Sequence, residues 1–237
     1  MTIKLISLDL DGTLWDTYGP IRRADHAQWA FLRSHYPDSA PFKGSEALVE
    51  IRDRTWSEHR EHVHNMSRMR FLFLEQVLLA AGYDAHAADR GAKDAFSVFL
   101  EERQKVELFD GVGETLALLR KNYRLAALTN GNSDVFKSSA GVQFEFALRA
   151  EEVGAKKPDP AMFNALLESA DLHPEEVLHV GDHHTDDVEG AAAVGIRAVW
   201  LREDEPVEPS AHAVAEIRSL RELPGVLDVI VNSVPPR

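Results

Sequence analysis

Acidic and imidazole side chains crowd into one short stretch of the sequence, GDHHTDDVEG at residues 181–190. Such a concentration indicates a metal site, because carboxylates and imidazoles are common metal ligands. The adjacent His183 and His184 suggest zinc, whereas the aspartates of the stretch suggest magnesium. Neighbouring side chains diverge on an extended backbone, and a zinc site needs histidines that converge. The metal must therefore be decided by ligands elsewhere in the chain.

A second acidic group follows the first apolar run of the chain, in LDLDGTLWD at residues 8–16. Asp9 and Asp11 are two residues apart, so an extended backbone would point both side chains the same way. If Asp182 lies close to them in space, the three carboxylates form a cluster of hard oxygen ligands. Mg²⁺ prefers such a cluster, since it binds through few carboxylates together with water and substrate phosphate. We therefore expect Mg²⁺ as the cofactor, with the histidines incidental.

The same residues could carry out phosphoryl transfer. One carboxylate attacks phosphorus to form an aspartyl-phosphate, and a second protonates the leaving oxygen and later activates water. The equatorial oxygens of the phosphoryl group then need cations and hydrogen-bond donors. Thr129, with the amides of Asn130 and Gly131, is a candidate donor, and Lys157 in AKKPDP is a candidate cation.

An alternation of apolar runs and helical patterns indicates how these residues are positioned. Short apolar runs predict strands, and the segments between them show helical periodicity, which favours βαβ units on a parallel sheet. Ligands bind at the carboxyl ends of the strands in such sheets, so Asp9, Thr129 and Asp182 should lie together. The predicted strands are 3–9, 123–130, 144–150, 176–182 and 196–202, and the predicted helices are 113–122, 160–170 and 187–195. Residues 203–237 should add a loop, an edge strand at HAVAEI (212–217), a terminal helix and a disordered tail SVPPR, for which we have no functional interpretation.

Residues 16–107 differ from the rest of the chain in their sequence pattern, because four successive segments carry apolar residues at helical spacing. Helices inserted directly after the first strand would form a small separate bundle. If this bundle lay above the strand ends, it would cover the site like a lid. We therefore expect an α/β fold with a Rossmann-like parallel sheet core at 1–15 and 108–237. An all-helical cap domain should occupy 16–107.

Composition restricts the classes of function. The chain has 237 residues, a formal net charge of −13, 44% hydrophobic residues and no cysteine. An acidic chain without a basic run is a poor candidate for binding nucleic acid or anionic membranes. The absence of cysteine excludes disulfides and thiolate zinc sites. With no signal peptide and no stretch long enough for a membrane helix, we expect a soluble cytoplasmic protein whose partner is a small molecule. Its oligomeric state does not follow from the sequence.

Four motifs together resemble a known family. LDLDGTL, ALTNGN, KKPDP and GDHHTDD stand in the order and approximate spacing of the motifs of the haloacid dehalogenase (HAD) superfamily, over residues 3–202. The resemblance implies a HAD-like phosphatase with a helical C1 cap. The family's haloalkanoic-acid dehalogenases lack an aspartate two residues after the nucleophile, so Asp11 favours a phosphatase. A phosphosugar mutase usually has a smaller helical cap and is a less favoured alternative.

The resemblance also assigns roles to residues. Asp9 corresponds to the nucleophile and a magnesium ligand, and Asp11 to the general acid/base, whose carbonyl also binds the metal. Thr129 and Lys157 correspond to the phosphoryl-binding residues. Two further residues correspond to the metal site, with the second supporting the metal's water shell: Asp182 and Asp187.

A more specific similarity concerns the substrate. ALTNGN, FEFALRA, LHVGD and RMRFLFLEQVLLAAG are similar to a bacterial branch that dephosphorylates flavin mononucleotide and 5-amino-6-(5-phosphoribitylamino)uracil. Phosphatases for nucleoside monophosphates, phosphoglycolate or sugar phosphates are alternatives. A non-catalytic metabolite-binding module on the same fold is another, although the intact set of motif residues argues against it.

Two adjacent pairs compete for the roles that the resemblance assigns. The family pattern places its lysine directly before the proline, which favours Lys157, and Lys156 should lie on the surface. Family spacing favours Asp187 as the metal residue, and Asp186 would then cap the helix that follows.

Other conspicuous residues have a structural interpretation beside the functional one. Trp15 and Asp16 could contact substrate or only pack at the base of the cap. In EHREHVHN (58–65), His59, His62 and His64 do not all share one helical face, so a polar cap surface is favoured over a metal site.

Overall fold

The computed structural model describes residues 2–202 and 210–232, with the side chains described up to residue 230. The loop expected after residue 202 and the tail SVPPR fall outside the described residues. The chain divides into two compact units, one of residues 1–16 with 106–237 and one of residues 17–105.

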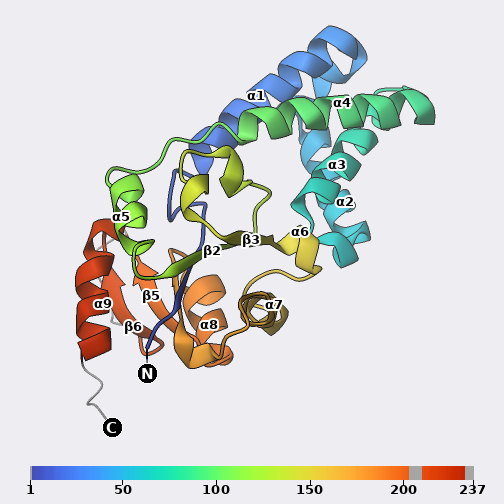
Figure 1. Cartoon of the computed structure of the whole chain (residues 1–237). Helices are drawn as coiled ribbons and strands as arrows, with labels where there is room; N and C mark the ends of the chain where they lie inside the picture. The colour runs from blue at the N-terminus through green and yellow to red at the C-terminus, as the bar shows by residue number, and fades with distance from the viewer. Residues whose placement is uncertain (1, 203–209, 233–237) are drawn as a thin grey trace. The chain divides into compact units, whose positions relative to one another are not determined.

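The larger unit is built on a parallel sheet, as the sequence predicts (Figure 1). All strand pairs within it are parallel, and the strand order is β3-β2-β1-β4-β5-β6. The predicted edge strand at 212–217 is confirmed as β6. The strands are β1 (Leu5–Leu8), β2 (Arg124–Thr129), β3 (Phe146–Arg149), β4 (Val177–Gly181), β5 (Arg197–Leu201) and β6 (Ala213–Ile217).

Helices cover both faces of this sheet. Side chains alternate between the two faces along each strand, so they contribute to two hydrophobic cores. On β1, Ile6 and Leu8 join the core that includes α5 (Val112–Leu119) and α9 (Leu223–Asn232). Leu5 points the other way, into the core formed with three helices on the opposite face. Those helices are α6 (Ala150–Val153), α7 (Pro160–Ala170) and α8 (Gly190–Ala193). Short 3₁₀ segments lie at Val135–Lys137, Gly141–Gln143, Pro174–Glu176 and Leu220–Glu222.

The strand order reverses direction beside β1. From β1 the chain builds outward through β2 and β3, and then returns to place β4 on the other side of β1. Loops at the carboxyl ends of β1 and β4 therefore leave in opposite directions, and this is the place where α/β sheets generally bind ligands. Both acidic motifs follow these two strands.

The helix predicted at 187–195 is confirmed in part, because α8 lies within it, but the helical segment starts earlier and its first turn is not α-helical. The chain forms a π-helical turn at His184–Glu189 and only then the short α8. In this wide turn the amide of Asp187 donates to the carbonyl of His183 at 2.8 Å, and the carboxylate of Asp187 accepts from the amide of His183 at 3.0 Å. Such bulges are frequent at functional sites.

Residues 17–105 fold into a helical unit around a core of their own. Capping side chains begin three of its helices: Ser45, Asn65 and Asp84 each accept a hydrogen bond from the amide three residues later. The helices are α1 (Tyr18–His35), α2 (Glu46–Glu58), α3 (Met66–Ala80) and α4 (Ala85–Arg103), with 3₁₀ segments at Pro37–Phe42 and Arg60–His62. The core of the unit includes Trp29, Leu32, Leu74, Val77 and Leu78. Over the described residues, no helix combines the length and hydropathy needed to cross a membrane.

Candidate active site

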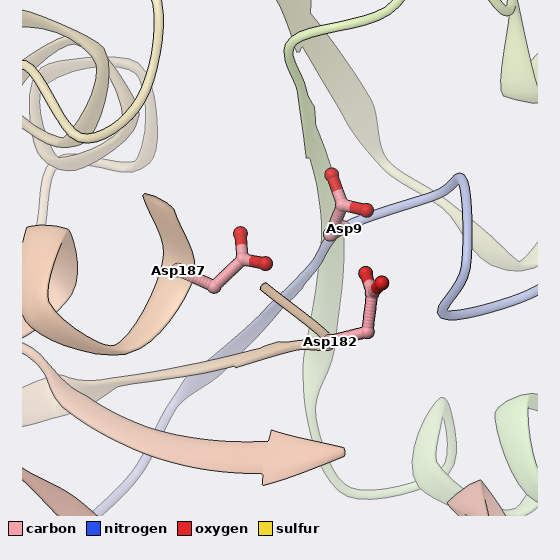
Figure 2. Close-up of side chains that lie close together, drawn as sticks. All are labelled: Asp9, Asp182 and Asp187. Carbon is pink, nitrogen blue, oxygen red and sulfur yellow. The ribbon is translucent and has the colours of Figure 1, made fainter. Parts of the chain in front are cut away.

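Three aspartates meet at the reversal of the strand order. Asp9 follows β1 and extends its pairing by donating its amide to the carbonyl of Val180 at 2.9 Å. Asp182 follows β4, and Asp187 lies in the π-helical turn. Each contributes a carboxylate oxygen, and these oxygens lie within 4.8 Å of one another. Figure 2 shows the three side chains close together, each carried by a different segment of the chain.

Lys157 links two of these carboxylates from below the surface. Its ammonium lies 2.6 Å from Asp9 Oδ1, 2.6 Å from Asp187 Oδ1 and 2.7 Å from the carbonyl of Leu128. Three acceptors match the three protons of the ammonium, so the buried charge is fully hydrogen-bonded. Lys156, by contrast, is exposed. The geometry therefore brings Lys157 and not its neighbour to the aspartates.

The electrostatics of the cluster follow from burial and from this one cation. Burial raises the pKa of Asp9, and the charge of Lys157 only partly opposes that effect. Burial and then the charge of Asp187 raise the pKa of Asp182. Burial alone would lower the pKa of Lys157, but Asp187 and Asp9 outweigh it, and the pKa is raised. Burial likewise opposes ionisation of Asp187, yet Lys157 and His179 hold its pKa below the usual value.

His179 is a buried partner of Asp187 that the sequence interpretation missed. Its Nε2 lies 3.1 Å from Asp187 Oδ1 and its Nδ1 lies 3.0 Å from Ser7 Oγ. The strand register explains this, because Ser7 on β1 pairs with His179 on β4 and both side chains leave the same face of the sheet. Burial lowers the pKa of His179, which favours the neutral ring. The signal in the sequence is a lone histidine inside the apolar run VLHVG.

Two glycines allow the carboxylates to approach the backbone closely. A Cβ on Gly12, where φ is +86°, would stand 2.3 Å from Asp182 Oδ2. A Cβ on Gly181 would stand 2.2 Å from Asp187 Cγ. The hydroxyl of Thr13 adds a hydrogen bond to Asp182 Oδ1 at 3.2 Å. The backbone is thus shaped to fit these two side chains.

The residues after β2 hold the lysine in position. The side chain of Asn130 donates to the carbonyl of Lys157 at 2.9 Å and accepts from its amide at 2.7 Å. The same amide group of Asn130 donates to Asp186 at 3.1 Å. The buried hydroxyl of Thr129 accepts from the amide of Gly131 at 3.0 Å. Asn130 therefore fixes the Lys157 loop through its side chain, in addition to any role of its backbone amide.

Asp11 points toward Trp15. The indole nitrogen of Trp15 donates to Asp11 Oδ1 at 2.8 Å, and the ring is buried in the core of the larger unit. Of the two interpretations of Trp15, this structure supports packing. The indole also orients the carboxylate of Asp11, which is only partly buried.

The two histidines of the 181–190 stretch lie outside the acidic cluster. His183 is exposed, and its Nδ1 accepts a hydrogen bond from the amide of Asp186. His184 lies against Trp200 and 2.8 Å from the hydroxyl of Ser210. Within the part of the chain that the structure describes, the one group of three acids or histidines with converging ligand atoms is the aspartate cluster. Its all-oxygen composition fits a hard cation such as Mg²⁺ and not zinc.

Comparison with known proteins agrees with this architecture. A family model described as haloacid dehalogenase-like hydrolase matches residues 3–195. The chain is 34% identical over 200 residues to 5-amino-6-(5-phospho-D-ribitylamino)uracil phosphatase YigB of Escherichia coli, covering 84% of each chain. It is 35% identical over 158 residues to a phosphoserine phosphatase of Thermus thermophilus, covering 64% of each.

A solved structure is similar over nearly the whole chain. The crystal structure of 2-haloacid dehalogenase from Pseudomonas syringae pv. tomato superposes on this chain with a TM-score of 0.89 and 39% sequence identity. The alignment covers 96% of this chain and 99% of that one.

The chain belongs to the haloacid dehalogenase-like hydrolase family. Within this family it is a phosphatase, a hydrolase of phosphoric monoesters.

Proposed function

We propose that the chain hydrolyses a small phosphorylated metabolite through an aspartyl-phosphate on Asp9, with Mg²⁺ as cofactor. The observation that carries this proposal is the buried Lys157 ammonium, 2.6 Å from both Asp9 and Asp187 and beside Asp182 at the strand-order reversal. This arrangement combines a carboxylate nucleophile, a fixed cation and a cluster of hard oxygen ligands. Phosphoryl transfer needs all three.

The residues of the cluster fit Mg²⁺. Asp9 and Asp182 would hold it, because burial raises the pKa of both carboxyls and a bound dication would offset that cost. Asp187 already accepts hydrogen bonds from Lys157, His179 and the amide of His183, so we assign it to the support of the metal's water shell. When bound, Mg²⁺ would neutralise charge on the transferring phosphoryl group.

The chain's own residues would carry the two steps. In the first step, a carboxylate oxygen of Asp9 attacks phosphorus, the ester P–O bond breaks, and the carboxylic acid of Asp11 gives its proton to the departing alkoxide. In the second step, water attacks the phosphorus of the aspartyl-phosphate, and Asp11 takes its proton. The acyl P–O bond then breaks, which frees inorganic phosphate and restores the carboxylate of Asp9. Thr129 would donate to a phosphoryl oxygen, and Lys157 would stabilise the negative charge of the phosphoryl group, exchanging one of its present acceptors for a phosphoryl oxygen when substrate binds.

The substrate we propose carries a ring and a phosphorylated polyol chain. Support comes from the 34% identity to the ribitylaminouracil phosphate phosphatase, which extends over 84% of both chains. Flavin mononucleotide has the same ribityl phosphate and is the second substrate of this proposal.

A 2-haloacid dehalogenase is the alternative suggested by the similar crystal structure. Halide leaves without protonation, so that reaction has no use for an acid at residue 11. Asp11, held by Trp15 at 2.8 Å, therefore favours the phosphatase.

A substrate panel tests the proposal directly. Phosphate release would be measured for ribitylaminouracil phosphate, flavin mononucleotide, nucleoside monophosphates, phosphoglycolate and sugar phosphates, with Mg²⁺ and with chelator. Halide release from 2-chloropropionate would be measured beside it. We expect Mg²⁺-dependent phosphate release that Asp9→Asn lowers by at least about 1000-fold, as for loss of a covalent nucleophile. Full activity of Asp9→Asn, or halide release in place of phosphate release, would overturn the proposal.

A further inference from the structure

The helical unit contains a cavity of about 250 Å³ between α1, α2 and α3. Its walls carry three aromatic rings, one from each helix: Trp29, Trp56 and Phe73. Trp29 is 2% exposed, and Trp56 stands edge-on to Phe73 with ring centroids 6.4 Å apart. All the residues that line the cavity belong to residues 17–105, so the helical unit forms it by itself.

An arginine with spare hydrogen-bond donors lines the same cavity. The guanidinium carbon of Arg70 lies 3.6 Å from the ring centroid of Phe99, a cation–π contact. Among the described residues its hydrogen-bond and ion-pair partners are Gln28 Oε1 at 3.4 Å and Asp25 Oδ1 at 3.6 Å, and the charge of Arg103 also acts on it. A guanidinium has five N–H donors, so these two long contacts leave most of them available. Burial lowers the pKa of Arg70, because removal from water disfavours the charged guanidinium.

The indole nitrogens of the cavity are available as well. Trp15 and Trp200, outside the cavity, each donate to an oxygen at 2.8–2.9 Å. Within the described part of the chain, neither Trp29 nor Trp56 has a hydrogen-bond partner for its indole nitrogen. The cavity thus combines aromatic rings with two arginines, Arg52 and Arg70, and Asp25 is the only carboxylate among its lining residues.

We infer that this cavity is a binding site for a planar heteroaromatic ring that bears carbonyl oxygens. Trp56 would stack on one face of the ligand with the Phe73 ring against the ligand's edge, the buried Trp29 would form part of the apolar wall, and Arg70 would donate to the carbonyl edge. Asp25 would accept from a ring N–H. A volume of about 250 Å³ is at the small end for ligand pockets, which favours one ring or a fused pair over a large cofactor.

A phosphate-free probe separates this site from the phosphatase chemistry. Lumazine is a fused planar ring pair with two carbonyl groups and no phosphate. Binding would be followed by quenching of tryptophan fluorescence in the full chain, corrected for absorption by the probe. We expect saturable binding with a Kd on the order of 1 mM or tighter, given the size of the probe. Quinoxaline, of similar shape but without carbonyls, should bind more weakly.

Variants assign the binding to the cavity. Trp56→Leu should weaken lumazine binding roughly tenfold through lost stacking. Arg70→Gln should weaken lumazine but leave quinoxaline unchanged. Phe71→Leu is the matched control, since Phe71 is a partly buried aromatic residue on the same helix α3 that does not line the cavity. Thermal melts of each variant establish that it is folded.

Two results would overturn the inference: no saturable binding of lumazine to the wild-type chain, or equal affinities of the folded Trp56→Leu and Phe71→Leu variants. Inhibition of phosphate release by lumazine, competitive with a ring-bearing phosphomonoester, identifies the ring as part of the substrate. This reading rests on the proposed function. Binding without inhibition supports the site and identifies a separate ring-bearing ligand. If the wild-type chain binds lumazine but releases phosphate from no substrate of the panel, the proposed function is wrong and the binding site stands.

Discussion

At the scale of single residues, Lys157 decides whether the acidic cluster is stable. It is 1% exposed and hydrogen-bonded to two carboxylates, so its removal leaves Asp9 and Asp187 buried without their cation. Lys157→Met should lower the free energy of unfolding by about 3–5 kcal/mol, the usual cost of breaking a buried ion pair, and abolish phosphate release. Denaturant melts in chelator measure the first effect.

Lys156→Met is the matched control, because the adjacent side chain is exposed and has the same chemistry. It should change the free energy of unfolding by no more than about 0.5 kcal/mol. Similar losses of stability for the two variants would contradict the central position assigned to Lys157.

At the scale of elements, the end of β4 must pass very close to the π-helical turn. Gly181 ends the strand, and a Cβ there would stand 2.2 Å from Asp187 Cγ. Gly181→Ala should therefore push Asp187 away from Lys157, lowering kcat/KM by about 100-fold and stability by about 1–3 kcal/mol. The same change at Gly113 in α5 meets only Leu108 at 3.8 Å.

Gly113→Ala should leave kcat/KM unchanged and raise stability by up to about 1 kcal/mol, since alanine favours helix. Steady-state kinetics and thermal melts of the two variants provide the comparison. Unchanged kinetics in Gly181→Ala would show that the turn adjusts without moving Asp187.

At the scale of the whole molecule, the metal should act as a stabilising ligand of the folded chain. The site gathers three carboxylates, two of them paired with Lys157, in a chain of net charge −13. Only the folded state brings Asp9 and Asp182 together, so Mg²⁺ should bind it selectively. At a Mg²⁺ concentration 100-fold above Kd, Tm should rise by about 5–10 °C over its value in chelator.

Asp182→Asn tests this expectation without an activity assay. Burial and the charge of Asp187 raise the pKa of Asp182, so a neutral side chain should not lower Tm in chelator. The Mg²⁺-dependent rise in Tm should be lost. An equal rise in wild type and variant, measured by calorimetry, would place the metal elsewhere.

The amino-acid sequence by itself determined the parallel α/β core and the family. Strands, helices and edge strand follow from local apolar periodicity, and the motif residues stand at strand ends because a parallel sheet gathers those ends along one edge. The order of the motifs along the chain was likewise readable without coordinates.

Only the tertiary structure decided how the site is connected. His179 joins Asp187 to Ser7 because strands 172 residues apart in sequence pair in one register. The π-helical turn at His184–Glu189 depends on a carboxylate that reaches back to its own backbone, which helical periodicity cannot indicate. The aromatic cavity of the helical unit depends on which faces of three helices meet. These features arise from long-range contacts, whereas sequence patterns report mainly the local preferences of the chain.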